Sequence, residues 1–460
     1  MKYRAYANYK DSGVEWLGEI PEEWEIKRLK WSLVFEKNGV WGEEPTGGED
    51  EITCIRVADF DRRYQVVSLE NLTLRDVSEK DRLNRILSQG DLLLEKSGGG
   101  EKWPVGYVVE FTHSFPAVCS NFIARLKLTN DSHTRFFKYF HLSLYENKVT
   151  TRTINQTSGI QNLDSQAYFN TTGVFPPLPT QISIAQFLDA ETAKIDRLIA
   201  ENNDLIALLQ EKRKALISHA VTRGLSELVS PEDPEFGEWA KPVKFKDSGV
   251  EWLGMVPEGW EVKKLKFACE LIKDGTHLPP TRVESGIPLL SVRNLQNGIF
   301  SFRDDDSMIS IKDYEELSKN FKPQAGDVLL AIVGATLGKS AIIFEGMDEF
   351  FIQRSLAVFR TSESFNSEFL NFFFQSQKFQ DVLWLNVGFS AQPGIYLGTL
   401  ENFSIPSPTA MEQKYIVLYL EKEIKNIDST IENVSSEIEL LKEHRSSLIT
   451  NAVTGKVKVD

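Results

Sequence analysis

Two segments of the chain carry apolar residues at a spacing of seven, with a second apolar row four residues further on. Neither segment contains Gly or Pro before Gly224 and Gly455, respectively. This pattern, over about five heptads, predicts two long helices with a coiled-coil seam. One such helix cannot bury its stripe alone, so we expect the two to pair; the alternative is that each packs only on its neighbouring globule. The seam positions are Leu188, Ile195, Asn202, Leu209 and Leu216, and then Leu420, Ile427, Val434, Leu441 and Leu448.

Outside these two helices, the chain has a different pattern of apolar and polar residues. Short apolar runs at 91–94, 106–111 and 327–333 are broken by Gly, Pro, Asn and Asp, which predicts short strands joined by turns. Phenylalanine-rich stretches at 136–140 and 369–374 predict short buried helices. This mixture predicts the α+β class.

The sequence contains an internal repeat. Residues 10–30 read KDSGVEWLGEIPEEWEIKRLK and residues 246–266 read KDSGVEWLGMVPEGWEVKKLK, with 16 of 21 positions identical at an offset of 236. The same offset aligns 90–94 with 326–330, and an offset of 232 later aligns Ile195-Asp196 with Ile427-Asp428. A period this long indicates a duplicated pair of domains and not a solenoid.

The repeat and the change of residue pattern between globule and helix divide the chain into five segments. We expect a first globule at 1–179, a first long helix at 180–230, a linker at 231–245, a second globule at 246–409 and a second long helix at 410–455.

Composition and charge narrow the function classes. The 460 residues are 41% hydrophobic, which excludes disorder of the whole chain, and no apolar run approaches the ~18 residues of a membrane span. No secretory signal is evident, and three widely spaced cysteines suit a reducing compartment, so we expect a cytoplasmic protein. The net charge of −14 argues against coating nucleic acid through bulk charge. Residues 101–160, however, hold seven basic and four acidic residues.

No segment predicts a catalytic or metal site. The loop 334–340 resembles a phosphate-binding loop, but has three residues between its first glycine and Gly338-Lys339 where that motif has four, so we expect a turn between strands. No Gly-x-Gly-x-x-Gly follows Ser97, and the acidic run 304–306 is typical of a solvated face. The six histidines have no metal-ligand spacing. We therefore expect no catalytic residue and no metal or other cofactor in this chain.

The duplicated motifs, taken in order, resemble the specificity subunit (HsdS) of type I restriction–modification systems over almost the whole chain. These motifs are KDSGVEWLG with a following Pro and Trp, a Gly-Asp strand with a glycine turn, a Pro-x-Pro-Thr segment followed by Gln, and a helix with Ile-Asp and Arg-x-x-Leu-Ile. The stretch 273–277 resembles the family's Asp-Gly-x-His turn. The corresponding region 36–48 lacks it, so the two globules are expected to read different bases.

The resemblance implies a pseudo-twofold repeat of two target-recognition domains separated by two spacer helices in an antiparallel coiled coil. Each domain would read one half of an asymmetric, bipartite double-stranded DNA target. The helices would dock two methylation subunits (HsdM), and restriction subunits (HsdR) would join in the full complex. S-adenosylmethionine, ATP and Mg²⁺ would then belong to the partner subunits, and this chain would be non-catalytic.

Candidate DNA-binding residues are polar side chains on the expected loops, because Arg and Lys suit guanine, Asn and Gln suit adenine, and Ser, Thr and Lys suit phosphates. Phe122, Phe136 and Phe140 are expected in the core, and the repeated tryptophans are expected to be packing anchors. The candidates in the first copy are Ser97, Lys102, Arg152, Asn155, Gln156, Thr157, Ser158, Gln161 and Asn162. Those in the second copy are Lys273, Thr276, His277, Arg293, Asn294, Thr336, Lys339, Gln353, Arg354, Ser390 and Gln392.

Two other functions stay open at this point. One is a nuclease or NTPase that uses the loop 334–340, which ATP binding by the isolated chain would favour. The other is a coiled-coil scaffold without specific DNA contact, for which sequence-independent binding at every salt concentration would be expected.

Overall fold

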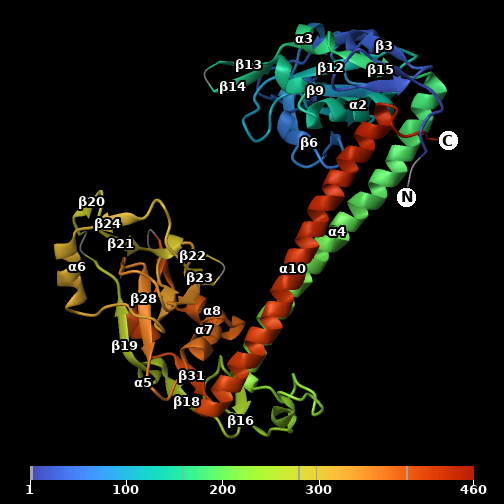
Figure 1. Ribbon diagram of the computed structural model, residues 1–460. Helices are drawn as coiled ribbons and strands as arrows, with labels where there is room; N and C mark the ends of the chain where they lie inside the picture. Colours follow the sequence, from blue (N-terminus) through green and yellow to red (C-terminus); the bar gives the residue numbers. More distant parts are fainter. Residues whose placement is uncertain (1–3, 158, 278–279, 297, 390–391, 460) are drawn as a thin grey trace. The chain divides into compact units, whose positions relative to one another are not determined.

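The computed structural model describes residues 4–157, 159–277, 280–296, 298–389 and 392–459 (Figure 1). Contacts divide the chain into two compact units. Unit 1 combines residues 1–202 with 436–460, and unit 2 consists of residues 203–435. Each unit therefore holds one globule together with parts of both long helices.

Unit 1 is built on a six-stranded sheet with a smaller sheet of three strands. Helix α2 (Thr134–Glu146) lies against β9 and β10, and buries Phe136 and Phe140 completely. The large sheet has the order β4 (Leu33–Asn38), β12 (Ile123–Leu128), β9 (Asp91–Glu95), β10 (Val108–Phe111), β7 (Val66–Val67) and β6 (Phe60–Asp61). The small sheet has the order β11 (Ala117–Cys119), β5 (Glu51–Ile55) and β8 (Thr73–Asp76).

Unit 2 contains two four-stranded sheets, and helix α7 (Ser367–Gln375), which packs on α8 (Gln377–Leu385), lies against the first of them. The first sheet has the order β19 (Cys269–Asp274), β28 (Leu356–Thr361), β25 (Val328–Ala331) and β26 (Ser340–Ile342). The second has the order β20 (Arg282–Val283), β24 (Ser307–Ile309), β21 (Ile287–Leu290) and β27 (Phe351–Ile352).

The strand pairings confirm the predicted repeat of α+β units. In unit 1, β12 lies between β4 and β9, and in unit 2, β28 lies between β19 and β25, all antiparallel. The parallel pair β5–β11 has its counterpart in β21–β27. The duplicated first motif also forms equivalent pairs, β3 (Glu25–Arg28) with β15 (Thr172–Phe175) and β18 (Glu261–Lys264) with β31 (Ser404–Ser407).

The repeated Gly-Asp motif has a structural role. The buried residues Asp91 and Asp327 stand at equivalent places, Asp91 as the first residue of β9 and Asp327 directly before β25. Each accepts a hydrogen bond from a backbone N–H three residues earlier, at 2.7 Å in unit 1 and 2.9 Å in unit 2. Each also pairs with an arginine, Arg125 at 2.6 Å and Arg360 at 2.8 Å. A buried carboxylate with these partners fixes the turn before the strand.

The two long helices are α4 (Leu178–Arg223) and α10 (Ala410–Val453). Both end at a glycine with positive φ, +80° for Gly224 and +78° for Gly455, as is usual where a helix ends in the left-handed conformation. A Cβ on Gly455 would lie 2.3 Å from the ring of Pro21, so no side chain fits there. The left-handed conformation thus favours glycine at both helix ends, and at Gly455 the close contact adds a steric reason.

The predicted seam is buried along most of its length. Val434 and Ile438 are 8% and 5% exposed, whereas Asn202, Leu209 and Leu441 are half-buried. The remaining residues of the first row are buried: Leu188, Ile195, Leu216, Leu420, Ile427 and Leu448. In the second row, Ile199 and Ile424 are also buried, whereas Ile206 and Ile431 are half-buried.

Two ion pairs show that the helices run antiparallel. In unit 1, the Arg445 Nε lies 3.0 Å from the Asp196 Oδ1, and in unit 2, the Arg213 Nε lies 3.3 Å from the Asp428 Oδ1. In both pairs a residue of α4 meets one of α10, and the order along the two helices is reversed. The repeat offset of 232 converts one pair into the other. The two ion pairs are therefore the same contact made twice, as in a two-fold symmetric interface.

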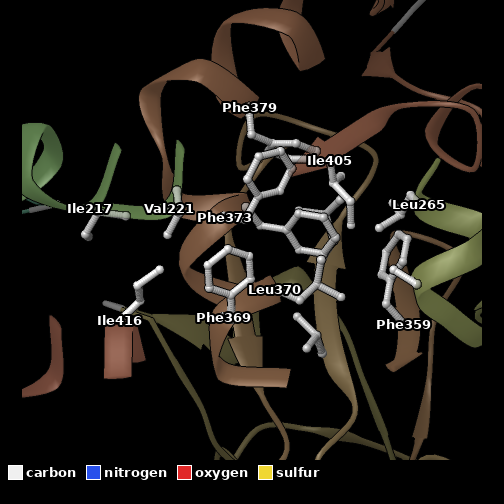
Figure 2. Close-up of a cluster of buried hydrophobic side chains, with 14 of the residues drawn as sticks. Ile217, Val221, Leu265, Phe359, Phe369, Leu370, Phe373, Phe379, Ile405 and Ile416 are labelled. Carbon is white, nitrogen blue, oxygen red and sulfur yellow. The ribbon is translucent and has the colours of Figure 1, made fainter. Parts of the chain in front are cut away.

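The core of unit 2 is completed by the helix that belongs to the first repeat. Figure 2 shows Ile217 and Val221 of α4 beside Ile416 of α10 and phenylalanines of α7, including Phe369 and Phe373. All five side chains are at most 1% exposed. The second repeat therefore does not bury its own core alone.

Unit 1 has the reciprocal arrangement, because the end of α10 contacts the first globule. The Tyr9 hydroxyl donates to the Gly455 carbonyl at 3.1 Å. The Asn147 Nδ2 donates to the Thr450 Oγ1 at 2.9 Å. These contacts tie the helix of the second repeat to the globule of the first. Over the part of the chain that the structure describes, no helix is both long and apolar enough to cross a membrane.

We expect Ile217→Ala to lower the free energy of unfolding of unit 2 by about 2–4 kcal/mol, because a nearly inaccessible side chain is removed from a packed core. Urea denaturation of the full chain would measure this loss. Leu208→Ala is the matched control on the same helix, because Leu208 is 62% exposed, and it should change stability by less than about 0.5 kcal/mol. Equal effects of the two substitutions would contradict the packing of α4 into unit 2.

Candidate DNA interface

Four loop segments of unit 1 meet beside the main sheet. They are the turn after β4, the turn between β11 and β12, the segment after β9, and a hairpin of β13 (Ile154–Thr157) and β14 (Ile160–Leu163). The Gly39 N–H donates to the Ile123 carbonyl at 2.9 Å, and the Lys96 N–H donates to the Phe122 carbonyl at 2.7 Å. The Leu163 N–H donates to the Lys96 carbonyl at 2.8 Å. Backbone hydrogen bonds thus hold the four segments in one row.

Unit 2 repeats this row bond for bond. The Gly275 N–H donates to the Leu356 carbonyl at 3.0 Å, and the Ile332 N–H donates to the Ser355 carbonyl at 2.9 Å. The Ile395 N–H donates to the Ile332 carbonyl at 3.0 Å. The hairpin here consists of β29 (Gly388–Phe389) and β30 (Pro393–Gly394). We call this four-segment arrangement the loop frame.

An isolated bridge in each unit joins the hairpin to the segment after the central strand. Ser97 pairs with Asn162 in unit 1, and Val333 pairs with Gly394 in unit 2. These positions differ by 236 and 232, the offsets of the sequence repeat. The structure therefore brings together two segments that the sequence could only name separately.

The turn after the first long strand needs glycine in both units. A Cβ on Gly39 would lie 2.0 Å from the Cys119 carbonyl oxygen, and one on Gly275 would lie 2.2 Å from that of Ile352. In unit 1, Asn38-Gly39-Val40-Trp41 occupies the place of residues 274–277. The first copy therefore lacks the Asp-Gly-Thr-His side chains but keeps the backbone turn.

The hairpin of unit 1 presents amides on its exposed surface. Asn155 lies opposite Asn162, and Gln156 lies opposite Gln161. The Ser97 hydroxyl donates to the Asn162 Oδ1 at 2.6 Å. Gln161 is 8% exposed, and its Oε1 accepts from a backbone N–H at 3.3 Å. We therefore leave Gln161 out of the candidate interface, because its side chain serves the fold.

The remaining candidates of unit 1 divide into two groups. Lys102, Arg152, Asn155 and Gln156 are exposed, and their side chains form no hydrogen bond or ion pair with another described residue. The Thr157 side chain and Ser158 lie outside the described residues. Unit 1 thus offers two cations and two amides whose hydrogen-bonding groups are available to a ligand.

In unit 2, the frame brings Thr276 beside Gln353 through a parallel bridge. The His277 Nε2 lies 2.6 Å from the Asp274 Oδ2, so this ring is held by its own turn. Gln392 is exposed at the hairpin. Three exposed cations form no side-chain hydrogen bond or ion pair with another described residue: Lys273, Lys339 and Arg354.

Two candidate residues of unit 2, Asn294 and Arg293, already make contacts within the protein. Asn294 is 1% exposed, its Nδ2 donates to the Ser301 carbonyl at 2.9 Å, and its Oδ1 accepts from the Ser291 N–H at 2.9 Å. Because its side chain cannot reach a ligand, we exclude Asn294. Arg293 is exposed, but its Nη1 lies 3.0 Å from the Asp305 Oδ2. Ser390 lies outside the described residues.

The loop 334–340 is the turn between β25 and β26, as the sequence predicted. The Leu337 N–H donates to the Gly334 carbonyl at 3.1 Å, and the Lys339 N–H donates to the Thr336 carbonyl at 3.1 Å. The Thr336 hydroxyl is buried and has no described hydrogen-bond partner. A strand follows the loop and not a helix, so neither the backbone N–H groups nor a helix N-terminus is arranged for a phosphate.

The sequence did not single out three exposed residues of the unit 1 frame. Phe122 is 47% exposed, which corrects its predicted place in the core, whereas Phe136 and Phe140 are buried as expected. Trp41 is 36% exposed, and the Arg75 guanidinium lies 4.0 Å from its ring centre. Asn121 is exposed beside Phe122. An alignment of the two repeats through the turn before β12 and β28 pairs Asn121 with Arg354. Because Arg354 is already a candidate, this alignment would have found Asn121 as well.

The cysteine thiols and the possible metal ligands of the described residues are not arranged as in a catalytic site. Burial raises the pKa of the Cys54 thiol to about 11 and those of Cys119 and Cys269 to about 12, so these thiols stay protonated at neutral pH. Among the described residues, no group of three or more His, Cys, Asp or Glu side chains could hold a metal ion. The loop frame itself carries amides, cations and aromatic rings.

Comparison with known proteins identifies the family. The family model described as "Type I restriction modification DNA specificity domain" matches residues 257–440, and the first half of the chain repeats the second. The MjaVIII type I restriction enzyme specificity subunit of Methanocaldococcus jannaschii is 25% identical over 96% of this chain and 94% of its own length. The chain is thus similar over almost its whole length to specificity subunits of type I restriction–modification systems. The EcoBI specificity subunit of Escherichia coli is 24% identical over 75% of this chain and 70% of its own length.

Two solved structures share the fold. The HsdS subunit from Thermoanaerobacter tengcongensis superposes with a TM-score of 0.54 at 15% identity, over 95% of this chain and 98% of that one. A chain from a study of assembly and conformational transition in the type I system superposes with a TM-score of 0.67 at 17% identity, over 94% of this chain and 98% of that one. A specificity subunit is the non-catalytic, DNA-binding component of its restriction system.

We expect Gly275→Ala to destabilise unit 2 by about 1–3 kcal/mol, because the new methyl group would overlap a backbone carbonyl. Gly398→Ala in α9 (Leu397–Leu400) is the matched control, because its Cβ would meet nothing within 4 Å. Denaturation midpoints of the two variants would test this. A Gly275→Ala protein as stable as the control would show that the turn can open without cost.

Proposed function

We propose that each unit of this specificity subunit reads one half of an asymmetric, bipartite double-stranded DNA target. The observation that carries this proposal is the loop frame, which has the same backbone hydrogen bonds in both units but different exposed side chains. The common backbone holds the exposed side chains of the two units at equivalent positions. Different side chains on that frame would recognise different base pairs, and the two halves of the target would differ.

The side chains of the frame suit the edges of bases. Arg and Lys donate to guanine O6 and N7, and Asn and Gln pair with adenine N6 and N7 in the major groove. A two-stranded hairpin such as β13–β14 fits that groove. The proposed DNA-binding residues of unit 1 are Ser97, Lys102, Arg152, Asn155, Gln156, Thr157, Ser158 and Asn162. Those of unit 2 are Lys273, Thr276, His277, Arg293, Lys339, Gln353, Arg354, Ser390 and Gln392; Thr336 is left out because its hydroxyl is buried.

We further propose that the long helices dock two methylation subunits, one through each helix. Leu208 on α4 is 62% exposed, and its repeat counterpart Leu440 on α10 is 65% exposed. A partner that binds twice needs the same surface twice, and an exposed leucine at equivalent positions provides it. Restriction subunits would join this assembly. S-adenosylmethionine, ATP and Mg²⁺ would be bound by the partner subunits.

Exchange of the second globule tests the reading of half-sites. Replacing residues 246–405 with the corresponding domain of another specificity subunit should change one half of the selected target and leave the other unchanged, because each unit has its own loop frame. Selection of binding sites from a random DNA pool would measure this. A change in both halves would contradict independent reading, and the absence of any selected sequence would contradict the proposed function itself.

Subunit stoichiometry tests the docking surface. Leu208→Glu and Leu440→Glu should each reduce the number of copurified methylation subunits from two to one, because a carboxylate would have to be desolvated in an apolar contact. The double substitution should remove both. Leu198→Glu is the matched control: Leu198 is 48% exposed on α4, but its repeat counterpart is Thr430. The masses of the complexes would measure this number. If the complex of the double variant still contains two methylation subunits, these leucines are not the docking surface.

A further inference from the structure

The loop frame of each unit contains one tight turn that joins two strands directly. In unit 1, the turn connects β11 to β12, and the Ile123 N–H donates to the Ser120 carbonyl at 3.0 Å. In unit 2, it connects β27 to β28, and the Leu356 N–H donates to the Gln353 carbonyl at 3.0 Å. The central residues of these turns are Asn121-Phe122 and Arg354-Ser355. The backbone is therefore the same, and the two central side chains differ.

The first central residue of each turn has an unused side chain. Asn121 and Arg354 are both exposed, and neither side chain forms a hydrogen bond or ion pair with another described residue. His277 of the unit 2 frame differs in this respect, since its ring already contacts Asp274. An amide and a guanidinium thus stand at equivalent places, with their hydrogen-bonding groups available.

The second central residue differs in polarity between the units. Phe122 is 47% exposed, and its ring lies 3.6 Å from the place of a Cβ on Gly98, so it rests against the next segment of the frame. At the equivalent position, Ser355 is half-buried, and its hydroxyl oxygen is inaccessible. Unit 1 therefore presents an apolar surface beside its amide, and unit 2 presents its guanidinium without one.

These two pairs match the two kinds of base pair. An asparagine amide pairs with adenine N6 and N7, and a phenylalanine ring packs against the methyl group of thymine. An arginine guanidinium donates two hydrogen bonds to guanine O6 and N7. The A·T pair needs both an amide and an apolar contact, whereas the G·C pair has no methyl group.

We propose that this turn is a specificity determinant of each unit, and that it reads an A·T pair in unit 1 and a G·C pair in unit 2. The inference rests on the proposed reading of one half-site by each unit. Because both ends of the turn continue into paired strands, the side chains are held in place before DNA binds.

Transplanting the turn tests the proposal in the full chain. The double variant Arg354→Asn, Ser355→Phe should change one position of the unit 2 half-site from G·C to A·T and leave the unit 1 half-site as it was. The reciprocal variant Asn121→Arg, Phe122→Ser should change one position of the other half-site from A·T to G·C. Selection of sites from a random DNA pool, followed by sequencing, gives both halves in one experiment.

Single substitutions guard against a variant that misfolds. Arg354→Ala removes only an exposed side chain and should lower the preference for G·C at that position roughly tenfold or more, with the melting temperature unchanged. Arg282→Ala is the matched control, because Arg282 is an exposed arginine of the same unit on β20, outside the loop frame. It should leave the selected sequence unchanged.

The outcomes separate this inference from the proposed function. If the wild-type chain selects a bipartite site and the folded turn variants select that same site, the turn is not a determinant, while the reading of half-sites stands. If Arg354→Ala and Arg282→Ala have equal effects, the contact is nonspecific and the inference is wrong. If the wild-type chain selects no sequence, the proposed function fails, and this inference fails with it.

Discussion

The antiparallel pairing of α4 and α10 is the interaction on which both units depend. A helix of more than forty residues with one apolar stripe is unstable in water unless a partner covers that stripe. Here the partner is the repeat of the same sequence, and the ion pairs Asp196–Arg445 and Arg213–Asp428 are repeat-related copies of one contact. Each helix end then enters the other repeat's globule, as Ile217 does in unit 2. The chain thus folds as two interdependent copies of one unit.

One repeated pair of residues near the starts of the long helices has a structural role. Gln181 and Gln413 occupy equivalent places near the helix starts, and both are buried. The Gln181 Oε1 accepts from the His133 N–H at 2.8 Å, and the Gln413 Oε1 accepts from the Asn366 N–H at 2.7 Å. Each amide ties the start of a long helix to its globule. Residues of this kind are the same in both repeats because the backbone they support is the same.

The residues that differ between the repeats lie where that common backbone reaches the surface. Gly39 and Gly275 are required by a close backbone approach, but the side chains that follow them are Val40-Trp41 in one unit and Thr276-His277 in the other. A rigid frame with variable exposed side chains lets one fold present different recognition chemistry without loss of stability. Under the proposed function only the loops would contact DNA, which is compatible with an acidic chain that carries local cationic loops.

The sequence alone determined the repeat, the two long helices and the α+β class, because periodicity and identity between segments are properties of the chain itself. It also located the loops that carry the candidate site. Only the tertiary structure decided which loop residues are accessible. Asn294 and Gln161 have suitable chemistry, but are buried, whereas Phe122 is apolar and exposed. Burial depends on segments far apart in the chain that meet after folding, and no local pattern in the sequence encodes that meeting.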